Sequence, residues 1–316
     1  MNKPVTFFIE NIKGKKIYKT IRNKESEFYK QHLTQYGGKP ILSGEETNQW
    51  IIEQIRCGKP LMVCRFGSNE LATVKTFDFE VKRKYTHQLD RAHRFTGLFP
   101  ETEEIGRQFA ERMKDDIPSA DLIGIWPQPY EEYYIKKYGA SDLKCTWLGS
   151  LEPWSNPENP WTKALAGKTV LVVHPFTDSI HLQYQKREQL FPGTGYLPDF
   201  RLITLRSVQT AAGEEDPRFS SWFEALEWMK REIMVRDFDI AILGCGAYGF
   251  PLAAEIKKAG KQAVHLGGAT QLLFGITGGR WDNDPVIQML VNDAWVRPMP
   301  HERPIDSEKI ENNCYW

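Results

Sequence analysis

A glycine-rich turn between two apolar runs, within residues 239–268, constrains the fold of this chain more than any other feature. The first run, Ile240–Leu243, has the length and β-branching of a buried strand. A G-x-G-x-x-G spacing follows it, leads into a helical pattern and a second apolar run, and consists of Gly244, Gly246 and Gly249. A strand–turn–helix–strand unit of this kind places backbone N–H groups and a helix N-terminus beside an anion.

Three interpretations of this turn are open. Glycine allows positive φ and lets a phosphate approach the backbone without meeting a Cβ, which fits a phosphate or nucleotide-diphosphate site. A NAD(P)-type or flavin site would need an acidic residue about 20 positions further on, and residues 264–267 contain none. The glycines would also suit tight helix–strand packing without any ligand.

A second strand–turn–helix junction follows the apolar run at residues 60–66. Arg65 ends this run, Gly67 begins the turn, and Ser68 and Glu70 open the next helix. Ligands of open α/β sheets bind at the carboxyl ends of the strands. We therefore expect these side chains to lie at a ligand site.

Apolar runs alternate with helical patterns from residue 60 to 266. This alternation predicts an α/β fold with a mostly parallel, doubly wound sheet and helices on both faces. We expect a catalytic domain at 59–283, an N-terminal helical extension at 1–58 and a tail at 284–316 that packs on the domain. Three prolines within residues 147–161 predict a long crossing loop there.

Composition narrows the class of protein. Lys plus Arg equals Asp plus Glu at 41 each, so no net field attracts nucleic acid or anionic lipid. The five cysteines form no C-x-x-C pair, which favours reduced thiols in the cytoplasm. No apolar segment reaches the ~20 residues that a membrane span needs.

Four motifs together resemble the GT-D type glycosyltransferases, a Rossmann-like family: Arg65–Glu70, Gly244–Gly249, Gly267–Gly268 and Phe274–Trp281. The resemblance covers residues 55–282. It implies transfer of a sugar from a nucleotide-diphosphate sugar, a UDP-sugar in the first instance, to a glycan or glycoconjugate acceptor in cell-surface polysaccharide assembly. Peripheral contact with a lipid-linked acceptor or with other glycosyltransferases would accompany that activity.

The chain departs from this family at one position. The family's R-[FY]-G-D-G-E turn carries two acids at the nucleotide-sugar and metal site, and here Ser68 replaces the first while Glu70 matches the second. The resemblance implies Mn²⁺ or Mg²⁺ held by Glu70 and donor phosphates. Asp78–Glu80 and Asp282–Asp284 are candidate replacement acids, although Asp284 also suits a plain helix start. Binding without metal, and a non-catalytic relative that only binds nucleotide sugar, stay open, as does a dinucleotide-binding oxidoreductase.

Charge on the leaving diphosphate could be met by Arg65, by Arg280 and by the helix N-terminus after Gly246. Tyr248 could stack on a base or bond a phosphate. The residues expected to bind the donor are Arg65, Gly67, Ser68, Gly244, Gly246, Tyr248, Gly249, Gly268 and Arg280.

A general base is also needed if the sugar is transferred with inversion. His174 ends an apolar run, and Asp178 follows where it could orient the imidazole. His265 has the same placement, and both histidines also fit structural roles. Together with Glu70, the pair His174 and Asp178 forms the expected catalytic set.

Overall fold

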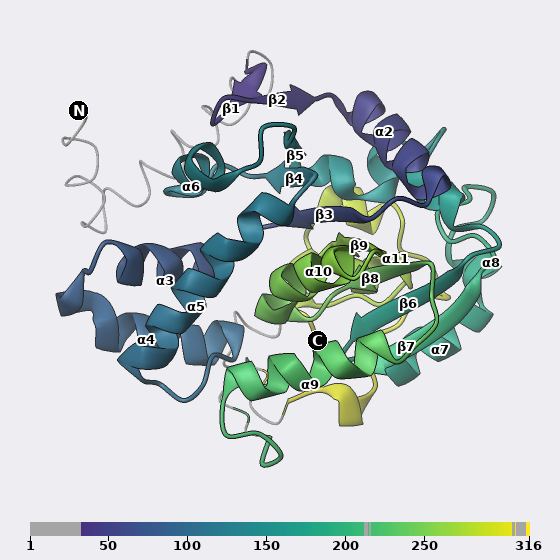
Figure 1. Cartoon of the computed structure of the whole chain (residues 1–316). Helices are drawn as coiled ribbons and strands as arrows, with labels where there is room; N and C mark the ends of the chain where they lie inside the picture. The colour runs from purple at the N-terminus through teal and green to yellow at the C-terminus, as the bar shows by residue number, and fades with distance from the viewer. Residues whose placement is uncertain (1–32, 212–213, 215, 305–306, 308–313) are drawn as a thin grey trace.

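The computed structural model describes residues 33–211, 214, 216–304, 307 and 314–316 (Figure 1). Within these residues one nine-stranded sheet has the order β1-β2-β5-β4-β3-β9-β8-β6-β7. Only β1 and β2 pair antiparallel, and the other neighbours are parallel. The predicted α/β fold with a mostly parallel, doubly wound sheet is confirmed.

The strands are β1 (Gln35–Tyr36), β2 (Lys39–Leu42), β3 (Leu61–Arg65), β4 (Leu122–Ile125), β5 (Lys144–Trp147), β6 (Thr169–His174), β7 (Arg201–Arg206), β8 (Ile240–Leu243) and β9 (Gln262–His265). The α-helices are α2 (Gly44–Cys57), α3 (Ser68–Asp78), α4 (Tyr85–Thr96), α5 (Glu103–Asp116), α6 (Glu131–Tyr138), α7 (Thr177–Gln185), α8 (Arg187–Leu190), α9 (Trp222–Met234), α10 (Gly249–Lys258), α11 (Ala269–Leu273) and α12 (Pro285–Gln288).

Both faces of the sheet are buried, which explains why its central strands are apolar between their first and last residues. Alternate side chains of β6 and β8 enter opposite layers: Leu171 and Leu243 join the layer of α3, α5, α9 and α10, whereas Val172 and Ile242 join the layer of α2, α7 and α11. Figure 1 shows α9 and α10 crossing the front of the sheet.

The N-terminal expectation needs correction. Residues 35–42 form two strands, and β2 pairs in parallel with β5 through Ile41 and Cys145. The segment before residue 59 therefore contributes an edge of the sheet as well as α2 and is not a separate helical extension. The part of that expectation that falls on residues 1–32 lies outside the described residues.

The proline-rich segment 147–161 is not an open loop. It winds into short 3₁₀ turns, and Trp161 is fully buried beneath it. The Trp161 indole N–H donates to the Leu151 carbonyl at 2.8 Å, and its backbone N–H donates to Asn48 Oδ1 at 2.8 Å. The prolines break regular helix, but Trp154 and Trp161 join the core layer that contains α2.

Candidate functional site

A pocket lies at the carboxyl ends of six parallel strands. Its space, including the mouth that opens to solvent, is about 1140 Å³. One lining residue ends or directly follows each of β3, β4, β6, β7, β8 and β9, namely Arg65, Trp126, His174, Ser207, Gly244 and His265. This edge is where open α/β sheets bind ligands.

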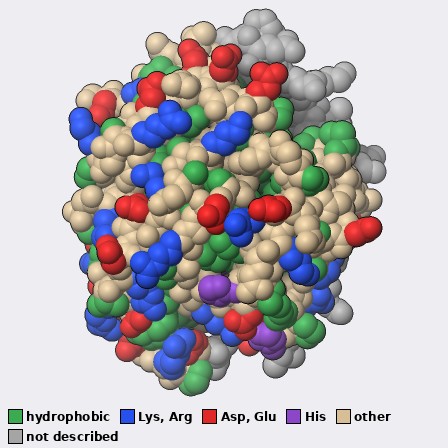
Figure 2. All heavy atoms as spheres, turned by 90° about the vertical axis from the view of Figure 1, so that its right-hand side faces the viewer, with side chains coloured by type: hydrophobic (Ala, Val, Ile, Leu, Met, Phe, Trp, Pro, Cys, Tyr) green, Lys and Arg blue, Asp and Glu red, His purple; other side chains and the backbone are tan. Residues whose placement is uncertain are grey.

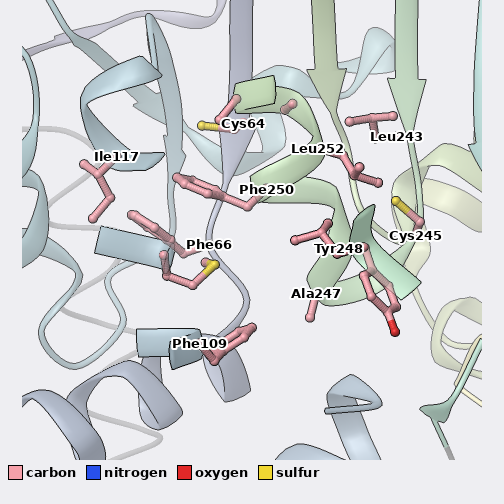
Figure 3. Close-up of a cluster of buried hydrophobic side chains, with 14 of the residues drawn as sticks. Cys64, Phe66, Phe109, Ile117, Leu243, Cys245, Ala247, Tyr248, Phe250 and Leu252 are labelled. Carbon is pink, nitrogen blue, oxygen red and sulfur yellow. The ribbon is translucent and has the colours of Figure 1, made fainter. Parts of the chain in front are cut away.

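The turn at Gly67 and the turn at Gly244–Gly249, together called the glycine-rich turns below, meet in this pocket. Phe66 precedes the first turn and Phe250 follows the second, and their rings stack with centroids 4.8 Å apart (Figure 3). Both side chains are buried where α10 packs on β3. The stack fixes the spacing of the turns, so Glu70 and Gly246 line the same cavity.

Arg65 is the clearest anion-binding feature of the pocket. Its guanidinium lies over the Trp126 ring, 5.1 Å from the centroid, and the indole N–H of Trp126 is held by the Phe66 carbonyl at 2.9 Å. The described residues offer this half-buried guanidinium neither a hydrogen bond nor an ion pair. Its N–H donors therefore stay available to a bound anion.

Glu70 folds back over the start of α3. A Cβ added to Gly67 would lie 1.7 Å from Glu70 Oε2, so Gly67 makes room for this carboxylate. The φ of Gly67 is −82°, so the turn itself does not require glycine. Burial raises the pKa of Glu70, and Arg65 opposes that rise. Among the residues that the structure describes, Glu70 is the only acidic side chain lining the pocket.

The candidate replacement acids lie elsewhere. Asp78 pairs with Lys114 at 2.6 Å, and Asp282 pairs with Arg297. Asp284 Oδ1 accepts the backbone N–H of Val286 at 3.0 Å, as an N-cap. One partly buried carboxylate does not form a divalent-ion site by itself, and phosphate oxygens would have to supply the remaining ligands.

The glycines of the second turn have different roles. Gly246 has a φ of +56° and open space above its Cα, which is the geometry expected at a phosphate-binding turn. A Cβ on Gly244 would meet His174 Cδ2 at 2.5 Å, and one on Gly249 would meet the His265 ring at 2.2 Å. Gly244 and Gly249 therefore make room for histidines. Gly244 also lines the pocket, whereas Gly249 does not, which corrects the expected binding role of Gly249.

Replacing Gly249 by Ala should destabilise the protein by about 1–3 kcal/mol, because the new methyl group collides with a buried ring. Gly149→Ala is the matched control, since nothing lies within 4 Å of its added Cβ and its φ is not positive. Urea unfolding of both variants checks the expectation. Equal stability of the two would show that His265 can move away.

Both histidines are held neutral. His174 Nδ1 accepts the N–H of Phe176 at 3.0 Å, so the ring proton is on Nε2. His265 Nδ1 lies 3.1 Å from the Leu243 carbonyl and donates to it. Burial lowers the pKa of each imidazole to about 3. His174 therefore presents a donor to the pocket, not the base that the sequence suggests.

The predicted pairing of His174 with Asp178 is not formed. Asp178 is exposed, lies outside the pocket lining and contacts His301 Nε2 at 2.8 Å. Ligand atoms of Asp178, His301 and Glu302 lie within 4.8 Å of one another. Glu302, however, accepts the backbone N–H groups of Asp178 and Ser179, so its carboxylate caps α7.

Tyr248 lines the pocket but cannot serve as an open stacking platform. Its ring is buried and stacks on Trp222, with centroids 4.7 Å apart and planes 8° apart. Figure 3 draws this ring in a cluster of buried hydrophobic side chains. The expected base-stacking role is therefore corrected to a packing role.

Residues 314–316 form a wall that the sequence gives no signal for. The Tyr315 hydroxyl accepts from Arg280 Nη1 at 3.1 Å, and the guanidinium lies 4.7 Å from the ring centroid. A Cβ on Gly268 would meet Tyr315 Cε1 at 2.5 Å, so Gly268 also serves packing. Trp316 lines the pocket with a buried indole N–H that has no hydrogen-bond partner among the described residues.

Glu131 is a further residue that sequence analysis misses. It begins α6, is fully buried, and its Oε2 accepts the N–H groups of Trp126 and Gln128 at 3.3 Å and the Tyr36 hydroxyl at 3.2 Å. Burial raises its pKa to about 7. The residue thus holds in place the loop that carries the indole beneath Arg65.

Glu131→Gln should change the pH dependence of stability. The folded protein keeps a proton on Glu131 up to a pKa of about 7, whereas the unfolded chain loses it near pH 4.5. The stability from this group is therefore present below about pH 4.5 and lost as pH rises through 7. The unfolding free energy of the variant minus that of the natural protein should therefore increase by up to about 3 kcal/mol between pH 5 and pH 8. A pH-independent difference would contradict this.

Comparison of the chain with protein-family models, with curated proteins and with solved structures finds no match. In the part of the chain that the structure describes, no helix is long and apolar enough to cross a membrane.

Proposed function

We propose that this protein is a glycosyltransferase that takes its sugar from a nucleotide-diphosphate sugar, with a UDP-sugar as the first donor to test. The observation that carries the proposal is that Arg65 and Gly246 lie in one pocket at the carboxyl edge of the sheet. An unpaired guanidinium and an open positive-φ turn are complementary to the two phosphates of a diphosphate.

The leaving diphosphate would be stabilised by the Arg65 guanidinium and by backbone N–H groups at Gly246. Arg280 reaches the same cavity and is oriented by Tyr315. In transfer, the bond between the anomeric carbon and the phosphate oxygen breaks, and a bond to the acceptor hydroxyl forms. The acceptor proton would pass to Glu70, because the acceptor nitrogen of His174 is already occupied by Phe176.

Mn²⁺ or Mg²⁺ would neutralise charge on the diphosphate if it binds. Glu70 would be its one protein carboxylate in the described part of the pocket. We propose a glycan or glycoconjugate acceptor and action in the cytoplasm in cell-surface polysaccharide assembly, with lipid-linked acceptors or other glycosyltransferases as peripheral partners. Five cysteines without a disulfide fit a reducing compartment.

A thermal-shift panel tests the donor class. UDP, GDP, CDP and NAD(H) are each added with and without Mn²⁺. A nucleoside diphosphate at 100 times its Kd should stabilise the folded state by about 2.7 kcal/mol, whereas NAD(H) should not. Stabilisation by NAD(H) alone would favour the oxidoreductase instead, for which β9 supplies His265 where an acid is expected.

Glu70→Gln tests the chemistry. Donor hydrolysis or transfer should fall about 10²- to 10⁴-fold if Glu70 takes the proton, while Glu80→Gln, at an exposed position beyond α3, should leave the rate unchanged. A protein that binds the diphosphate but turns over no donor in its natural form would be a non-catalytic relative. Full activity in Glu70→Gln would remove Glu70 from the mechanism.

A further inference from the structure

Three aromatic side chains form an exposed patch outside the pocket. Phe79, Tyr130 and Tyr133 are 43%, 40% and 37% exposed. Their rings lie in mutual contact, with centroids 5.0 Å apart for Phe79 and Tyr130, 5.5 Å for Phe79 and Tyr133, and 6.1 Å for Tyr130 and Tyr133. We call this the aromatic patch. Contiguous exposed apolar surface marks interaction sites.

The backbone at the patch is held in an uncommon conformation. Tyr130 has a φ of +70° and Glu80, next to Phe79, has a φ of +48°. Non-glycine residues with positive φ cost energy and cluster at functional sites. Here the two turns bring aromatic rings together at the surface. Burial in the core therefore does not offset the energetic cost of the positive φ angles.

Basic side chains surround the aromatic patch. Lys75 Nζ lies 5.1 Å from the centre of the Tyr130 ring, and Lys137 Nζ donates to the Tyr133 hydroxyl at 3.0 Å. Lys82–Lys84 follow Phe79 and are exposed, and Lys136 is exposed on α6. Two acids lie among these basic residues: Glu80 is 3.6 Å from Arg107, and Glu132 accepts the Gly37 N–H and keeps its charge.

Although the net charge of the chain is zero, positive charge is therefore concentrated around the aromatic patch. Figure 2 shows both signs interspersed over the face that carries α7 and α8. The aromatic patch instead combines aromatic rings with a lysine-rich rim. Protein interfaces are depleted in lysine, whereas aromatic rings at the headgroup level and clustered lysines suit an anionic membrane surface.

We propose that the aromatic patch and its basic rim dock the protein on an anionic phospholipid surface. Two segments connect the patch to the pocket: α3 begins at the pocket with Ser68 and ends one residue before Phe79, and Tyr130 follows Trp126 by four residues. A helix the length of α3 spans about 16 Å. Docking would hold the pocket close to the bilayer, and it does not depend on what the pocket binds.

Vesicle co-sedimentation of the full chain tests this docking. The natural protein should partition onto vesicles of phosphatidylcholine with phosphatidylglycerol, weakly onto pure phosphatidylcholine, and less as salt rises. Lys82→Glu with Lys84→Glu should reduce partitioning more than about twentyfold, because each basic residue near the surface contributes about fivefold. Replacing Phe79 and Tyr133 by Ser and Tyr130 by Asn, which tolerates positive φ, should also reduce it at least about tenfold.

Matched variants elsewhere serve as controls. Met289→Ser removes a 79%-exposed apolar side chain far along the chain, and Lys59→Glu with Lys186→Glu reverses two exposed lysines. Both should partition as the natural protein does, and circular dichroism checks that all variants fold. No partitioning of the natural protein, or an equal loss in the controls, would overturn the proposal. Nucleoside-diphosphate binding should be unchanged throughout, which separates this result from the donor site.

Discussion

Replacing Arg65 by Ala is expected to weaken nucleoside-diphosphate binding about 10- to 100-fold. A hydrogen bond to a charged group contributes about 1.5–3 kcal/mol, and each 1.4 kcal/mol is about tenfold in Kd. No described residue forms a hydrogen bond or an ion pair with the Arg65 guanidinium, so its N–H donors can bind a ligand. Isothermal titration calorimetry measures the change. The Kd of Arg65→Lys should lie between those of the natural protein and Arg65→Ala, because lysine keeps the positive charge but lacks the planar guanidinium.

Arg206 provides the control for this experiment. It ends β7 as Arg65 ends β3, but it lies outside the pocket lining and donates to the His301 carbonyl. Arg206→Ala should leave the Kd unchanged. The stability of Arg65→Ala should also change little, since the variant loses the contact with Trp126, about 0.5–1 kcal/mol, and the positive charge that opposes the raised pKa of Glu70. Loss of binding together with loss of folding would not support a ligand role.

Replacing Phe250 by Ala is expected to cost about 3–5 kcal/mol of stability and to weaken diphosphate binding as well. The side chain is buried, and its ring stacks on Phe66 between the two glycine-rich turns. Without the stack, Gly67 and Gly246 would no longer be held at a fixed spacing. Urea unfolding and calorimetry on the same preparation measure both effects.

Phe274→Ala separates packing from site geometry. Phe274 is equally buried but belongs to the opposite layer and does not line the pocket. The Phe274→Ala variant should lose as much stability as Phe250→Ala. Where it is folded, it should keep its affinity for the diphosphate. Equal loss of affinity in both variants would show that general softening, not the spacing of the turns, controls binding.

The sheet could be predicted from the sequence because strands buried on both faces are apolar between their end residues. β3, β6, β8 and β9 all carry this signal. The edge strands could not be predicted, because β2 is only partly buried and too short to show a pattern. β5 alternates lysine and threonine with apolar residues, so its place between β2 and β4 depends on pairing that no local pattern records.

The residues of the candidate site also fall into those that could be predicted from the sequence and those that could not. Arg65, Glu70 and Gly246 follow strands directly, so parallel pairing is enough to bring them together. Gly244 and Gly249 could not be assigned, because a phosphate and a histidine ring require the same absence of a Cβ. The predicted place of Asp178 is wrong because its side chain contacts His301, and Tyr315 could not be assigned because it lies far along the chain from the other pocket residues.

NMR titration of the ¹⁵N-glycine-labelled protein with the tightest-binding nucleoside diphosphate tests whether both glycine-rich turns hold one diphosphate, as we propose. We expect the Gly67 and Gly246 amide resonances to shift along one saturation curve with a single Kd, while the resonance of Gly149, outside the pocket, does not shift. A saturable shift at only one of the two turns, or at neither, would contradict this proposal.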